Sequence, residues 1–182
     1  MAKKDAGVSF GLWWRAAVPV ALVLLVACMP WSARGEYLGT IDARGIERLI
    51  AQAQGRAVVV SFFATWCSPC REETPEFIAL RDEVSHEDLL FVGVSLDFDE
   101  EALTGYVRSE GVNYPVYLAE PGVAAHFGVE GIPALLIWDA EGTLRSAQAG
   151  YLPREEMRAL VMRYIGRGAD VSQGRSRTAS GG

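Results

Sequence analysis

The stretch "SFFATWCSPCREETPEF", residues 61–77, decides the fold, because within it a buried strand gives way to a helix at a pair of cysteines. The run "AVVVSFFA", residues 57–64, is β-branched and aromatic, as is typical of a strand covered on both faces. A helix-like stretch follows from residue 68 to about 84, with Pro69 in a first turn that tolerates a missing amide. This arrangement predicts that Cys67 lies at a helix N-terminus.

Cys67 and Cys70 are spaced for reversible disulfide chemistry. The unpaired amides and the dipole at a helix N-terminus stabilise negative charge, so the Cys67 thiolate should form more readily than that of a free cysteine. Cys70 follows one helical turn later on the same face and is placed to attack a mixed disulfide at Cys67. We therefore expect Cys67 to attack a substrate, Cys70 to resolve the complex, and the two to close into a redox disulfide.

Two cysteines at this spacing also occur in metal sites and in structural disulfides. A structural zinc site needs two more ligands, but only His86 and His126 are at hand outside the N-terminal segment, and neither is spaced as a second clip. A structural disulfide over so short a loop constrains little of the unfolded chain. A copper(I) ion held by both thiolates stays open as an alternative, since soft ligands suit it. We predict no bound metal and no cofactor.

The chain of 182 residues suits one ordinary globular domain. Strand patterns alternate with helical ones, which indicates βαβ units, an α/β fold with helices on both faces and an antiparallel hairpin at one edge. The further elements expected are helices at 45–55, 99–111 and 154–165, strands at 89–97 and 114–119, a helical turn at 121–128, and a hairpin at 134–150.

The longer stretch "VVVSFFATWCSPCREETPEF" is similar to the active-site strand and helix of the thioredoxin superfamily, especially its TlpA/ResA-like membrane-tethered thiol-disulfide oxidoreductases. A second stretch, "FGVEGIPALLIWDAEGTL" at residues 127–144, resembles the segment that carries the cis-proline of that family. The resemblance covers about residues 37–165. It implies a thioredoxin-like fold, with a central mixed sheet flanked by helices and an additional αβ insertion at residues 97–126.

The resemblance also implies a substrate-binding surface. By it the bond between Ile132 and Pro133 is cis and faces the cysteines, so that the backbone of Ile132 pairs with an extended substrate segment. We expect Trp66 and Pro69 to complete this surface. The alternatives are an ordinary trans proline and, for Trp66, simple packing.

Proton transfer is expected to depend on Glu73. Thioredoxin has a buried aspartate six residues before its first cysteine, and Ser61 stands at that position here. Glu73, three residues after Cys70, resembles the acid of the TlpA-like family, and we expect it to tune or shuttle the Cys70 proton. The alternative is a solvated glutamate in the first helical turn, beside Glu72.

The N-terminal segment has the order of an export signal. Lys3, Lys4 and Arg15 precede the apolar run "AAVPVALVLLVAC" at residues 16–28. Its last four residues resemble the lipobox of bacterial lipoproteins, which implies acylation of Cys28. An uncleaved membrane anchor and ordinary cleavage remain alternatives. We thus expect an export signal or anchor at 1–35, a thioredoxin-like domain at 36–166, and a disordered tail at 167–182.

These observations predict an extracytoplasmic, periplasmic oxidoreductase of the bacterial envelope that reduces disulfides in exported proteins. By resemblance the clients include apocytochrome c or copper-site cysteines, and a membrane electron carrier of the CcdA or DsbD kind resupplies electrons. The runner-up is a copper(I)-binding module, although its copper-handling relatives have a C-x-x-x-C spacing and a distal histidine that this chain lacks. The net charge of −6 and the absence of a basic run argue against nucleic-acid binding.

Overall fold

The computed structural model describes residues 35–53 and 55–165. The expectations for the export segment with Cys28, and for the tail after residue 166, fall outside these residues. Within the described ranges, no helix has the length and apolarity that crossing a membrane requires.

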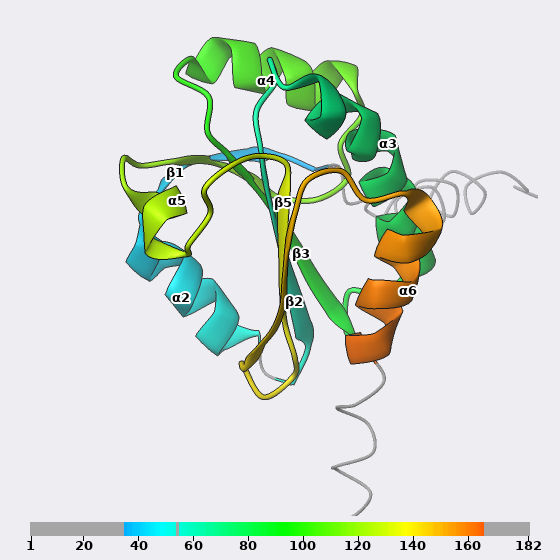
Figure 1. The fold of residues 1–182 in the computed structure, drawn as a ribbon. Coiled ribbons are helices and arrows are strands. Elements are labelled where there is room, and N and C mark those ends of the chain that lie inside the picture. The colour runs from blue at the N-terminus through cyan, green and yellow to red at the C-terminus, as the bar shows by residue number, and fades with distance from the viewer. Residues whose placement is uncertain (1–34, 54, 166–182) are drawn as a thin grey trace, which may run out of the picture. The chain divides into compact units, whose positions relative to one another are not determined.

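A six-stranded mixed sheet forms the centre of the domain (Figure 1). Its spatial order is β1-β4-β3-β2-β5-β6. The first four strands in this order run parallel to one another, whereas β5 pairs antiparallel with β2 and with β6. The strands span Tyr37–Ile41 (β1), Ala57–Phe63 (β2), Leu89–Ser95 (β3), Val116–Ala119 (β4), Ala134–Trp138 (β5) and Leu144–Ala149 (β6).

Helices cover both faces of this sheet, as the sequence predicted. α2 and α5 lie on one face, and α3 and α6 lie on the other (Figure 1). α4 packs with α3 and α6 into the same hydrophobic cluster. The helices span Ala43–Gln52 (α2), Ser68–Glu83 (α3), Glu100–Ser109 (α4), Val123–His126 (α5) and Arg154–Ile165 (α6).

β2 lies inside the sheet, between β3 and β5, and every one of its side chains is buried. Since side chains alternate along a strand, Val59 and Phe63 join the cluster with α3, α4 and α6, whereas Val60 and Phe62 join the cluster with α2 and α5. Complete burial of such a side chain contributes about 1.5–3 kcal/mol. The continuous apolar run therefore anchors both layers, and its C-terminal end carries the cysteine loop.

β1 is the one strand of the described chain that the sequence pattern did not predict. It contains only "YLGTI", its residues alternate between half-buried and exposed before Ile41, and Gly39 has a positive φ of 93°. Its backbone pairs with β4, which lies far along the chain. The pairing, and not the intrinsic preference of these five residues, makes this segment a strand.

Candidate active site

The cysteine loop begins where β2 ends, and it places Cys67 immediately before the first residue of α3. Cys67 is the N-cap of this helix, with φ −85° and ψ 109°, and its Sγ accepts a hydrogen bond from the Cys70 amide at 3.3 Å. Pro69 lies in the first turn, where the missing amide breaks no helical hydrogen bond. The prediction that Cys67 lies at a helix N-terminus is confirmed.

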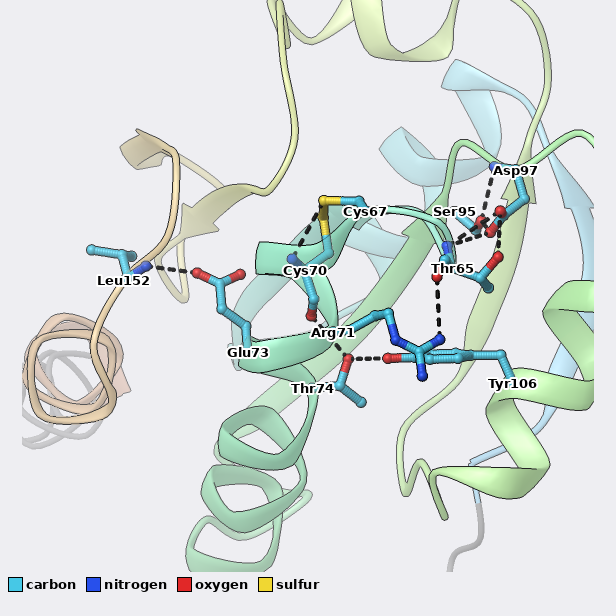
Figure 2. The surroundings of a disulfide bond; sticks show 10 residues. All are labelled: Thr65, Cys67, Cys70, Arg71, Glu73, Thr74, Ser95, Asp97, Tyr106 and Leu152. Atoms are coloured by element: carbon cyan, nitrogen blue, oxygen red, sulfur yellow. Dashed lines mark hydrogen bonds between the residues drawn. A yellow bond between two sulfur atoms is a disulfide. The ribbon is translucent and has the colours of Figure 1, made fainter.

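Cys67 and Cys70 are joined by a disulfide bond, with their Cα atoms 5.3 Å apart (Figure 2). Both residues pack into the cluster beneath α3, and Cys67 is 7% exposed while Cys70 is 2% exposed. The cysteine at the helix N-terminus is therefore the more exposed residue of the two. This agrees with the predicted division of roles, in which Cys67 attacks and Cys70 resolves.

Glu73 is buried, so the alternative of a solvated glutamate is wrong. Its side chain points toward the loop before α6, where Oε1 accepts a hydrogen bond from the Leu152 amide at 2.7 Å (Figure 2). Burial raises the pKa of Glu73 from 4.5 to about 7, and the Leu152 hydrogen bond opposes this only in part. A carboxyl group three residues from Cys70 that titrates near neutral pH suits proton transfer.

Of the four predicted substrate-binding residues, Trp66 and Pro69 are exposed, Ile132 is half-buried and Pro133 is buried. Trp66 is 65% exposed, which is inconsistent with the alternative that it only packs. Pro69 is also exposed. The bond between Ile132 and Pro133 is cis, as expected, and the Gly150 amide donates a hydrogen bond to the Pro133 carbonyl at 2.8 Å. Pairing of a substrate with Ile132 stays a prediction.

Asp97 is a site residue that sequence reasoning missed. It lies two residues after the end of β3, and its carboxylate accepts hydrogen bonds from the Thr65 amide at 3.0 Å and from the Thr65 hydroxyl at 2.7 Å (Figure 2). The Ser95 hydroxyl donates a further hydrogen bond to it. Asp97 thus holds the loop two residues before Cys67. The available signal was an acidic residue at the end of a buried strand parallel to β2.

The insertion helix α4 contacts the same loop through Tyr106. The Tyr106 hydroxyl lies 2.7 Å from the Thr74 hydroxyl, which in turn donates to the Cys70 carbonyl at 3.1 Å. The Arg71 guanidinium lies over the Tyr106 ring, 5.1 Å from its centre, and donates to the Thr65 carbonyl at 3.3 Å. The insertion therefore supports the polypeptide before and after the disulfide.

The remaining polar candidates lie apart from this chemistry. Ser61 is buried within β2, where it replaces the aspartate of thioredoxin. His126 is exposed on α5 and pairs with Glu47 at 2.8 Å, and His86 is exposed after α3. Among residues 35–53 and 55–165, no group of three or more His, Cys, Asp or Glu side chains is placed to hold a metal ion.

Comparison with known proteins agrees with this geometry. Residues 40–147 match the AhpC/TSA family. The chain is 28% identical to the thioredoxin-like protein YneN of Bacillus subtilis over 116 residues, which cover 62% of this chain and 68% of YneN. It is 26% identical to the thiol-disulfide oxidoreductase ResA of the same species, over 60% of this chain and 62% of ResA, slightly less than two thirds of that relative.

A solved structure gives the same result for the fold. The thiol:disulfide interchange protein of the thioredoxin family from Chlorobium tepidum superimposes with a TM-score of 0.59 at 30% identity, covering 64% of this chain and 84% of that one. The expected thioredoxin-like fold is confirmed. The chain belongs to the AhpC/TSA family and carries, at Cys67 and Cys70, the cysteine pair of a thioredoxin-like thiol-disulfide oxidoreductase.

Proposed function

We propose that the protein reduces disulfide bonds in exported client proteins by thiol-disulfide exchange at the Cys67–Cys70 pair. The observation that carries this proposal is the closed disulfide at the start of α3, with the more exposed cysteine at the helix N-cap. A thiolate at this position is stabilised by the free amides of the first turn, which suits a nucleophile that also has to leave again.

The reaction starts from the reduced pair. The Cys67 thiolate attacks one sulfur of the client disulfide, so that a mixed disulfide forms and the other client sulfur leaves as a thiolate and takes up a proton. Cys70 then loses its proton and attacks the Cys67 sulfur, which releases the second client thiol. The client gains two electrons and two protons, and the protein is left with the disulfide that the structure contains.

Glu73 is proposed as the acceptor of the Cys70 proton. Its carboxyl group is three residues from Cys70 on α3, is 4% exposed, and has a pKa of about 7. A group with this pKa accepts a proton during resolution and returns it to water afterwards at neutral pH. The exposed Glu72 beside it lacks this burial.

The direction and the place of the reaction rest on the sequence. Proline as the second residue between the cysteines resembles the reducing members of the superfamily, and the signal-like N-terminal segment supports tethering at the extracytoplasmic face of the envelope. Because such a compartment is oxidising, the spent disulfide needs a dithiol donor. We propose a membrane carrier of the CcdA or DsbD kind in this role, with apocytochrome c or copper-site cysteines among the clients.

The copper(I) alternative would use the same two sulfurs as thiolates. In the structure they are bonded to each other, a state that exchange requires and that copper binding does not use. Exchange is therefore the better supported reading.

Trapping of the mixed disulfide tests the proposal. In the full chain, Cys70→Ala leaves Cys67 without its resolving partner, so a reduced sample mixed with a disulfide-bonded client should accumulate a covalent complex through Cys67. Non-reducing electrophoresis and mass spectrometry of the purified complex identify the bond. Cys67→Ala is the matched control and should give no complex. An equal yield of the covalent complex from both variants contradicts the proposal. So does a wild-type protein that reduces no disulfide-bonded client.

A further inference from the structure

Resting on the proposed function, we propose that Trp66 and Phe98 form an apolar docking surface, here called the aromatic rim, that receives an apolar side chain next to the client cysteine. The occupant is a client polypeptide segment that carries its disulfide between apolar neighbours. The other substrate-binding residues were predicted from the resemblance to the thioredoxin superfamily, whereas Phe98 was not.

Phe98 is left almost entirely in the solvent. It is 96% exposed, more than any other large hydrophobic side chain of the described residues, and Trp66 is 65% exposed. Isolated exposed apolar side chains are common and need no explanation, but two exposed aromatic residues in segments that are hydrogen-bonded to each other next to the cysteine loop are different. Aromatic side chains that are free in the monomer are the residue type most enriched at the centres of protein interfaces.

Asp97 joins the two segments that carry these aromatic residues. It immediately precedes Phe98, and its carboxylate binds the amide of Thr65, which immediately precedes Trp66, at 3.0 Å. One step earlier, the Leu96 amide donates to the Phe63 carbonyl at 2.8 Å. The segments that follow β2 and β3 are thus joined at the end of the sheet that carries the disulfide (Figure 2). Trp66 and Phe98 are the residues that follow Thr65 and Asp97 in these two joined segments.

The position of the disulfide explains why a client would cover this surface. Cys67 is only 7% exposed, so a client sulfur reaches it only when the client backbone lies against the surrounding surface. Trp66 is bonded directly to Cys67 in the chain, and Phe98 follows Asp97, whose carboxylate binds the cysteine loop at Thr65. Because Asp97 holds both segments in place before a client arrives, docking orders little of the protein and loses little entropy.

Two disulfide-bonded peptides that differ at one position test the aromatic rim. One peptide has Phe beside its cysteine and the other has Ser there. In full-length Phe98→Ala, the KM for the Phe peptide should rise about tenfold while kcat changes less than about twofold, since about 1.4 kcal/mol of docking free energy corresponds to a factor of ten. The KM for the Ser peptide should stay within about twofold of the wild-type value.

Leu144→Ala is the matched control. Leu144 is 47% exposed and pairs with Trp138, at the opposite end of the sheet from Thr65. Both peptides should react with this variant as with the wild type. If Phe98→Ala alters neither KM, or alters both equally, the aromatic rim is refuted while turnover by the wild type leaves the proposed function standing. A change of sedimentation from dimer to monomer in Phe98→Ala would also refute it, because a second copy would then be the occupant.

Discussion

Two buried carboxylates flank the disulfide, and they are held in different ways. Glu73 and Asp97 lie on opposite sides of the cysteine loop (Figure 2). Asp97 accepts hydrogen bonds from the amide and hydroxyl of Thr65 and from the Ser95 hydroxyl, whereas one backbone amide, that of Leu152, binds Glu73. Burial with so few donors raises the pKa of Glu73 to about 7.

The comparison shows that the same chemical group is held in two different ways beside one disulfide. A carboxylate that collects several donors ties segments of the chain together, and Asp97 joins the ends of β2 and β3 in this way. A carboxylate that is buried with a single donor changes its protonation near neutral pH, which suits Glu73 to proton transfer. Substitutions at these two positions should therefore have different signatures.

The largest effect should come from Glu73→Gln on the resolution of the mixed disulfide. Glutamine keeps the acceptor oxygen for the Leu152 amide but takes up no proton, so release of the client at neutral pH should slow by about 100-fold. Rapid acid quenching followed by mass spectrometry measures the decay of the complex. Glu72→Gln, on the exposed side of the same helical turn, is the control and should resolve at the wild-type rate. Equal rates for wild type and Glu73→Gln would show that Glu73 is not the proton acceptor.

The second effect concerns the pH dependence of stability. Because the native pKa of Glu73, about 7, exceeds its ordinary value of 4.5, the native state binds the proton more tightly than the unfolded state does. This contribution is fully present below pH 4.5 and is lost as the pH rises through about 7. Relative to Glu73→Gln, the oxidised wild type should lose about 3 kcal/mol of unfolding free energy between about pH 4 and about pH 8. Urea unfolding of both proteins measures this difference, and a constant gap would contradict the raised pKa.

The smallest effect should be that of Asp97→Asn on stability and on the loop. Asparagine keeps one acceptor oxygen but replaces the other with an NH2 group, so donors then face donors on one side of the site and the free energy of unfolding should fall by about 2 kcal/mol. Amide hydrogen exchange at Thr65 should become faster. Asp99→Asn is the control, because Asp99 caps α4 and asparagine caps a helix equally well, with an expected change below about 0.5 kcal/mol. If the two variants lose the same stability, Asp97 holds the loop no more firmly than an ordinary cap.

Different parts of the molecule were predictable for different reasons. The runs at 57–64 and 89–97 predicted β2 and β3 because strands buried on both faces need continuous apolar side chains. β1 escaped prediction, since its five residues become a strand only through pairing with β4. The role of Asp97 escaped because its partner Thr65 lies 32 residues away in the chain.

The amino-acid sequence by itself determined the α/β class and the placement of Cys67 at the start of a helix, because strand burial, proline position and cysteine spacing are all local in the chain. The tertiary structure decided which carboxyl groups are buried beside that pair. Glu73 resembles the exposed Glu72 in sequence, and only the packing of the loop around Leu152 takes it out of water and raises its pKa. Burial and long-range hydrogen bonds arise from segments that meet only in the folded chain, so the local sequence pattern does not predict them.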